Sequence, residues 1–297
     1  MKIFITGSNG FVGKALVPYL KSKNHEIIAA TRDLYGDFSN QENWKQFLSG
    51  IDVVVHLAAR VHVMNETATN PDSEFQKMNV EATLRLAKDA KAVGVKRFIF
   101  LSSVKVNGEK TQDEPYLASD EPKPEDAYGR SKAMAEKELL KLHEPGIFEI
   151  VIIRPPLIYG NGVKANFQKL MSLVFRDVPL PFGRVNNRRS LCSVLNLCDL
   201  IATVIDHPKA SGEIFLVRDL HDYSLKTMIE EIAKIKGKTP HLLPVPVLMM
   251  NLGLMILGKK SFAERMFGNL HVDITKNKEL LNWKPPFSFQ ETFKKKL

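Results

Sequence analysis

The segment Lys2-Ile-Phe-Ile-Thr-Gly-Ser-Asn-Gly-Phe-Val-Gly13 joins a short apolar run to three regularly spaced glycines. The apolar run predicts a buried β-strand, and the pattern after it predicts an amphipathic helix over about 11–22. Glycines between a strand and a helix permit a tight turn and a close approach of the backbone to a bound group. The spacing is G-x-x-G-x-x-G instead of G-x-G-x-x-G, but the helix start still favours an anion. This segment therefore predicts a dinucleotide-binding turn.

Strand-like and helix-like segments alternate through the first 160 residues. Apolar runs predict four further strands, at 26–31, 52–57, 96–102 and 149–154. Helical periodicity predicts helices over about 72–92 and 128–143. This alternation is typical of βαβ units. We therefore expect an α/β fold, a Rossmann doubly wound parallel sheet, with residues 1–160 as the dinucleotide-binding domain.

The alternation loosens after Gly160, where proline and glycine clusters separate shorter elements. Helices are predicted at 166–176, 196–207, 225–236 and 248–257, and a strand is predicted at 214–217. We expect residues 161–297 to form a smaller C-terminal α/β substrate-binding region that is interleaved with the first. The apolar segment 248–257 is too short to span a membrane. We expect it to be a buried or subunit-contact helix, with a membrane-surface helix as the alternative.

Of the 297 residues, 44% are hydrophobic and 25% are charged, as in soluble globular proteins. No segment reaches the about 18–20 apolar residues of a membrane span, and the N-terminus lacks a signal-peptide layout. The net charge of +9 comes from scattered lysines, which argues against a nucleic-acid partner. Cys192 and Cys198 fit no metal-ligand spacing, so we expect reduced thiols, no metal and a cytoplasmic location.

The end of the second predicted strand bears on the choice of cofactor. An acidic residue at this position would bind the ribose 2′-hydroxyl of NAD, whereas an arginine accommodates the 2′-phosphate of NADP. The chain has Thr31-Arg32-Asp33 here, and no acid lies in the strand itself. NADP(H) is therefore favoured because of Arg32, while Asp33 keeps NAD(H) possible.

The segment Tyr128-Gly-Arg-Ser-Lys132 places a phenol and an ammonium one helical turn apart on the same face. A nearby positive charge favours the phenolate, so we expect Lys132 to lower the pKa of Tyr128. A phenol with a lowered pKa could serve as a general acid and base towards a sugar or alcohol hydroxyl. The pair predicts proton transfer only in the company of other motifs.

Those motifs are present, and their order resembles that of an extended short-chain dehydrogenase/reductase of the NAD-dependent epimerase/dehydratase family of nucleotide sugars. They comprise Gly7/Gly10/Gly13, Gly36-Asp37-Phe38, His56-Leu-Ala-Ala-Arg60, Leu101-Ser-Ser103, Tyr128-x-x-x-Lys132, Arg154-Pro-Pro-Leu-Ile-Tyr-Gly160 and Trp283-Lys-Pro285. The resemblance runs over nearly the whole chain.

The resemblance implies roles for individual residues. Ser103, Tyr128 and Lys132 would be catalytic, and Ser103 would also bond the reacting sugar oxygen, whereas Ser102 would be structural. Asn166 and Arg189 would meet the nucleotide diphosphate, with Arg188 as the alternative to Arg189. The implied cofactor-binding residues are Gly7, Gly10, Phe11, Val12, Gly13, Arg32, Asp37, Phe38, Leu57, Ala58, Ala59, Tyr128, Lys132 and Pro155.

The resemblance also narrows the reaction. Ser103-Val104-Lys105 stands where the 4,6-dehydratases of this family carry an acid pair, so dehydration is not expected. We expect hydride transfer at C4 of a UDP-sugar, with a 4-keto reductase acting on a UDP-2-acetamido-2,6-dideoxy-4-hexulose preferred. The alternative is a UDP-glucose or UDP-N-acetylglucosamine 4-epimerase with tightly bound NAD.

Finer likeness, including Gly268-Asn-Leu-His-Val-Asp273, is to a bacterial surface-polysaccharide subgroup, which implies O-antigen-type biosynthesis. The family suggests a homodimer through two helices per subunit, one of them the helix of Tyr128. A non-catalytic, dinucleotide-sensing protein on the same scaffold is the remaining alternative. Such relatives commonly lose the Tyr or the Lys, and this chain keeps both.

Overall fold

The computed structural model describes residues 1–31, 35–61 and 71–294. Six strands form a parallel sheet in the order β2-β1-β3-β4-β5-β8. Their bounds are Lys2–Thr6 (β1), Glu26–Ala30 (β2), Val53–His56 (β3), Arg97–Leu101 (β4), Glu149–Arg154 (β5) and Ile214–Leu216 (β8). The strand order reverses between β1 and β3, which is where doubly wound sheets bind ligands. The expected Rossmann doubly wound sheet is confirmed.

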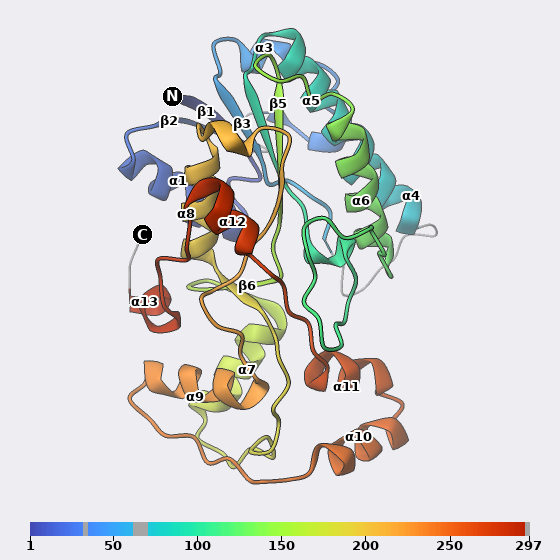
Figure 1. Ribbon diagram of the computed structural model, residues 1–297, viewed down its shortest axis with the longest axis vertical. Helices are drawn as coiled ribbons and strands as arrows, with labels where there is room; N and C mark the ends of the chain where they lie inside the picture. Colours follow the sequence, from blue (N-terminus) through green and yellow to red (C-terminus); the bar gives the residue numbers. More distant parts are fainter. Residues whose placement is uncertain (32–34, 62–70, 295–297) are drawn as a thin grey trace.

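Helices cover both faces of the sheet (Figure 1). On one face lie α1 (Phe11–Ser22) and α8 (Val194–Val204), which pack on Ile3 and Ile5. On the other lie α5 (Ala82–Ala92) and α6 (Ala127–Leu140), which pack on Phe4. Successive side chains of a strand point to opposite faces, so both layers are apolar and the strands read as continuous apolar runs.

The turn from β1 into α1 is tight because its glycines leave room for the backbone. Gly7 has φ +68°, a conformation that favours glycine, and Gly10 N–H donates to the Gly7 carbonyl at 2.9 Å. A Cβ on Gly13 would lie 2.5 Å from Ser8 Cα. The first turn of α1 can therefore pack directly on the loop.

The second half of the chain adds β6 (Leu157–Tyr159) and β7 (Leu191–Ser193), which pair in parallel, and helices α7 (Ala165–Phe175) and α9 (Leu225–Ile235). The remaining elements are η1 (Phe38–Asn40), α3 (Lys45–Leu48), α4 (Pro71–Phe75), the π-helical η2 (Gln76–Glu81), η3 (Val104–Val106), η4 (Pro208–Ala210), α10 (Val247–Ile256), α11 (Lys260–Phe267), α12 (Thr275–Leu281) and α13 (Phe289–Lys294).

The two halves are joined at the sheet and at its helices. β8 comes from the second half and pairs with β5 of the first. Asp199 of α8 accepts hydrogen bonds from the Tyr19 hydroxyl at 2.6 Å and from Trp283 Nε1 at 2.8 Å. The Trp283 motif thus anchors the C-terminal segment to both halves. A domain boundary at residue 160 stays a prediction.

Helix α10 was expected to be a buried or subunit-contact helix. None of its residues is buried within the chain, so the expectation of burial is wrong. Val247 and Met250 pack partly against the core between α7 and α9, while the opposite face is exposed. Figure 1 shows α10 at the far end of the molecule from the N-terminus. Among the described residues, no helix combines the length and the apolar character that a membrane crossing requires.

Replacement of Gly13 by alanine should destabilise the protein, because the new Cβ would press on the backbone of Ser8. We expect a loss of about 1–3 kcal/mol in the free energy of unfolding, measured by urea denaturation. The matched control is Gly253→Ala in α10, where a Cβ meets nothing within 4 Å and helix propensity improves. Equal effects of the two substitutions would contradict this account of the turn.

Candidate active site

A cavity of about 300 Å³ opens where β1 and β3 end, at the topological switch point. Five of the predicted cofactor-binding residues line it, namely Gly7, Gly10, Phe38, Ala58 and Ala59. The first turn of α1 carries no acidic residue, and no side chain caps it. Its N–H groups are therefore available to an anion, such as the diphosphate of a dinucleotide.

Several other predicted cofactor-binding residues flank the lining residues along the chain, whereas Pro155 follows β5. Phe11, Val12 and Leu57 pack against the core beneath the loop. The Asp37 carboxylate accepts from Ser39 N–H at 2.8 Å and so begins η1. The Pro155 carbonyl accepts from Val104 N–H at 2.9 Å. Arg32 lies outside the described residues.

His56 has a structural role next to the cavity, where it contacts the lining residues Thr6 and Phe38. Its Nδ1 lies 2.6 Å from Thr6 Oγ1 and its Nε2 lies 2.9 Å from Thr83 Oγ1. The ring is buried and stacks on Phe38 and Phe100. Burial, and then the charge of Lys132, lower the pKa of His56 well below its usual value, so the ring is neutral. The described residues contain no cluster of metal-binding side chains.

Tyr128 and Lys132 lie one turn apart at the start of α6, as the spacing predicts. Asp126 begins the helix, because its carboxylate accepts from Gly129 N–H at 2.7 Å. The Lys132 ammonium lies 6.0 Å from the Tyr128 ring centroid. It also donates to the Leu101 carbonyl at 2.8 Å and lies 4.3 Å from the Phe100 ring centroid. Lys132 therefore faces the end of β4, and Tyr128 lies one turn before it on the same helix.

The pKa of the phenol differs from the expectation of a lowered value. Burial, followed by the charge of Asp126, raises the pKa of Tyr128 above its ordinary value. Burial also lowers the pKa of Lys132 to about 7, against the opposing effect of Glu136. Desolvation thus weakens the positive charge that was expected to favour the phenolate.

Ser103 begins η3 directly after β4, and its Oγ accepts from Lys105 N–H at 3.2 Å. Its side chain is half-buried. Ser102 is buried and donates to Glu136 of α6, so it joins the strand end to the helix as expected for a structural residue. The two neighbouring serines therefore differ in role, because only Ser103 remains partly open.

A buried ion pair beneath these residues is absent from our sequence-based account. Arg154, at the end of β5, contacts Glu136 through Nε at 3.0 Å and through Nη2 at 2.6 Å. Arg154 Nη1 also donates to Asn107 Oδ1 at 3.1 Å. Arg154 was singled out only as part of a family motif, and no pattern in the sequence paired it with Glu136 of α6.

Asn79 is a second residue whose contacts the sequence analysis did not predict. It is buried in the π-helical turn η2 and lies between two parts of the site. Its Oδ1 accepts from Arg60 N–H at 2.8 Å, and its Nδ2 donates to Ser131 Oγ at 2.9 Å. It therefore connects the segment after β3 to the helix of Tyr128.

The predicted substrate residues lie in the second half. Asn166 is exposed in the first turn of α7. Arg189 donates from Nη1 to the carbonyls of Arg265 at 2.9 Å and Gly268 at 3.1 Å, at the end of α11. Arg188 is exposed and pairs with Asp222 at 3.2 Å. The structure thus separates the two arginines, of which Arg189 is the more enclosed.

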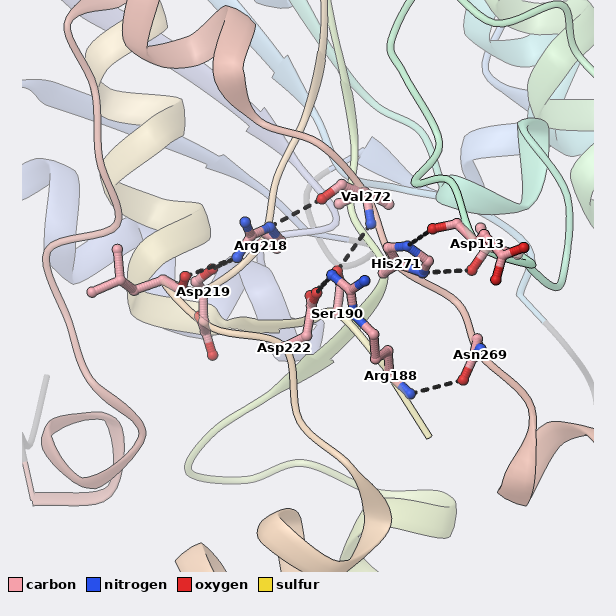
Figure 2. A network of polar contacts seen from close by, with 11 residues as sticks. Asp113, Arg188, Ser190, Arg218, Asp219, Asp222, Asn269, His271 and Val272 are labelled. Carbon is pink, nitrogen blue, oxygen red and sulfur yellow. Dashed lines mark hydrogen bonds and ion pairs between the residues drawn. The ribbon is translucent and has the colours of Figure 1, made fainter. Parts of the chain in front are cut away.

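Figure 2 shows how this region is held around the segment 269–272. Asn269 Oδ1 accepts from Arg188 N–H at 2.8 Å, and Val272 N–H donates to Ser190 Oγ at 3.0 Å. The buried His271 lies 2.7 Å from Thr111 Oγ1 through Nδ1. The segment therefore links the loop after β4 to the residues that precede β7, among them Arg189.

The amino-acid sequence is similar to a family of known enzymes and to individual members with names. Residues 3–217 match the sequence profile described as the NAD dependent epimerase/dehydratase family. A UDP-glucose 4-epimerase of Vibrio cholerae is 46% identical over 98% of this chain and 93% of its own length. An N-acetyl-alpha-D-glucosaminyl-diphospho-ditrans,octacis-undecaprenol 4-epimerase of Escherichia coli O157:H7 is 28% identical over 84% of this chain and 77% of its own.

A similar fold occurs in the crystal structure of a UDP-glucuronic acid 4-epimerase from Bacillus cereus in complex with NAD. It superposes with a TM-score of 0.76 over 98% of this chain and 94% of its own length. The two sequences are 23% identical, so this likeness concerns the fold alone.

The buried Lys132 predicts a pH-dependent stability of the nucleotide-free protein. Its pKa is about 7 in the folded protein, well below the usual lysine value, so the unfolded chain binds more protons above pH 7. The destabilising effect of Lys132 is therefore complete below pH 7 and declines as the pH rises. We expect Lys132→Met to stabilise the protein by about 2 kcal/mol more at pH 7 than at pH 9, in urea denaturation.

The control for this experiment is Lys141→Met, at an exposed position that follows the same helix. Its effect on the free energy of unfolding should be the same at both pH values. A pH-independent effect of Lys132→Met would show that the ammonium is not desolvated in the folded protein.

Proposed function

The chain belongs to the NAD-dependent epimerase/dehydratase family, and we propose that it is an enzyme that epimerises a UDP-sugar at C4. The observation that supports the proposal is the position of Lys132, one turn after Tyr128 on α6. It donates to the carbonyl of Leu101 at the end of β4, two residues before Ser103. A relative that matches almost the whole chain at 46% identity is named a UDP-glucose 4-epimerase. This name supports the choice of reaction and of substrate class.

The residues of the site suit a proton transfer at a sugar hydroxyl. Tyr128 would exchange a proton with the C4 hydroxyl through its phenol oxygen. Ser103 would donate a hydrogen bond to the same oxygen as negative charge develops there. Lys132 would favour loss of the phenol proton when its ammonium is protonated, although desolvation weakens this effect.

We propose NAD as the resident cofactor. Gly7, Gly10 and the start of α1 would hold its diphosphate, and Phe38, Ala58 and Ala59 would line its adenosine half. When bound, the nicotinamide supplies the hydride acceptor and donor for C4. The expected preference for NADP rests on Arg32, which lies outside the described residues. Solved structures with a similar fold contain either NAD or NADPH, so they leave this preference a prediction.

Epimerisation is proposed over the expected 4-keto reduction because of the relatives. Those named above are 4-epimerases, and the solved one contains NAD. The catalytic residues are the same for both reactions, so the site geometry does not separate them. The homodimer, the cytoplasmic location and a role in O-antigen-type biosynthesis stay predictions from the resemblance.

Incubation of the purified protein with UDP-N-acetylglucosamine, without added cofactor, tests the proposal. We expect UDP-N-acetylgalactosamine to form, as measured by anion-exchange chromatography, and NAD to be released when the protein is denatured. The same assay with UDP-glucose tests the unacetylated sugar. Tyr128→Phe should retain the NAD but lower kcat by at least about 100-fold, since it lacks the acid and base. Turnover only of a 4-keto sugar with added NADPH would instead establish the reductase.

Two adjacent serines provide a matched pair of variants. Ser103→Ala should lower kcat by about 10–100-fold with little change in stability, because Ser103 is proposed to bond the sugar oxygen. Ser102→Ala should keep most of kcat but lower the free energy of unfolding by about 1–3 kcal/mol, because Glu136 loses a buried donor. The reverse pattern, with kcat lost in Ser102→Ala alone, would overturn the assignment of Ser103.

A further inference from the structure

Helix α10 presents apolar side chains to solvent on a face that is polar in ordinary surface helices. Leu248, Met249, Leu252, Met255 and Ile256 form this face, which we call the α10 patch, and they are 55–80% exposed. At 100° per residue they fall within about 120° of one another around the helix. Val247 and Met250 point the other way, towards the core between α7 and α9. The helix is therefore anchored on one side and apolar on the other.

The patch extends beyond the helix itself. Phe262 of α11 is 51% exposed, and Leu257, between the two helices, is 68% exposed. Asn251 is the one polar residue within α10. An exposed apolar surface of this kind marks an interaction site with a protein or a membrane.

The sequence around α10 carries charge of one sign. Residues 239–263 contain no Asp or Glu, and Lys259 and Lys260 follow α10. Lys259 is exposed and directly follows the loop that ends α10. Apolar residues flanked by lysines are typical of segments that lie in the interface of an anionic bilayer.

A second copy of the chain fits this surface less well than a bilayer does. In a twofold dimer the same segment would face itself, and its lysines would repel one another. The dimer expected from the family uses α6, and Figure 1 shows α6 well separated from α10. Headgroups of anionic lipids, in contrast, would neutralise these lysines while the acyl region received the apolar side chains.

We propose that the α10 patch docks the protein onto the surface of an anionic membrane without crossing it. α10 has ten residues, which is sufficient to lie in the interface but too short to span the apolar layer. This docking does not depend on the proposed epimerase activity, because the patch contains none of the residues assigned to the site.

Vesicle flotation tests this proposal with the full-length protein. The vesicles contain either phosphatidylcholine alone or phosphatidylcholine with about one third phosphatidylglycerol. We expect the protein to float with the anionic vesicles at least about fivefold more than with the neutral ones, and less at high salt. Lys259→Gln should reduce the preference for anionic vesicles without abolishing binding.

The double variant Leu252→Glu/Ile256→Glu carries charges into the centre of the patch. It should lower the vesicle-bound fraction at least about tenfold, because both side chains would otherwise enter the interface. The matched control is Ile147→Glu, since Ile147 is 60% exposed in a turn outside the patch. It should bind vesicles as the wild type does, and circular dichroism should show that all variants fold.

Three results would overturn the proposal. The wild-type protein could fail to float with anionic vesicles, or the double variant could float equally well. The third result is a wild-type oligomer that dissociates in the double variant during sedimentation velocity, while no protein binds vesicles. That result would assign the α10 patch to a second copy of the chain.

Discussion

The buried ion pair between Arg154 and Glu136 is the constraint on which the catalytic region depends. Removing both charges from water costs several kcal/mol per ion, so the pair persists only because its hydrogen bonds are nearly complete. Arg154 belongs to the end of β5, and Glu136 belongs to α6. Their contact, with that of Ser102, fixes the rotation of α6 against the sheet. Tyr128 and Lys132 lie two turns and one turn earlier on the same face, so the pair sets their positions.

Burial has opposite consequences for the two charged centres on this face. Glu136 remains well paired with Arg154, whereas Lys132 relies on the Leu101 carbonyl, the Phe100 ring and the distant effect of Glu136. The sequence-based expectation considered the attraction between Lys132 and Tyr128 but not the desolvation of both groups. Desolvation favours neutral forms and prevails in the protein described here. The local environment, more than the spacing, therefore sets the proton affinity of the pair.

Much of the fold was accessible from the sequence, because its strands are continuous apolar runs. The expected bounds of β1, α1 and β5 agree with the structure to the residue. The strands β6 and β7 were missed because three residues give no periodicity. Asn79 and the partners of Arg189 were missed because they depend on contacts between distant segments. Helix α10 was expected to be buried or to contact a second subunit, and it is not buried within the chain. An apolar pattern does not reveal whether a neighbour covers it.

The return of β8 to the sheet limits how this chain could be divided or recombined. A fragment that ended near residue 160 would leave the edge of β5 without its partner strand and expose its backbone groups. The same fragment would lack α8, so Tyr19 would lose Asp199 and α1 would lose its packing partner. A chimaera between relatives therefore has to exchange β8 and α8 together with the first half, even where only the substrate loops are meant to change.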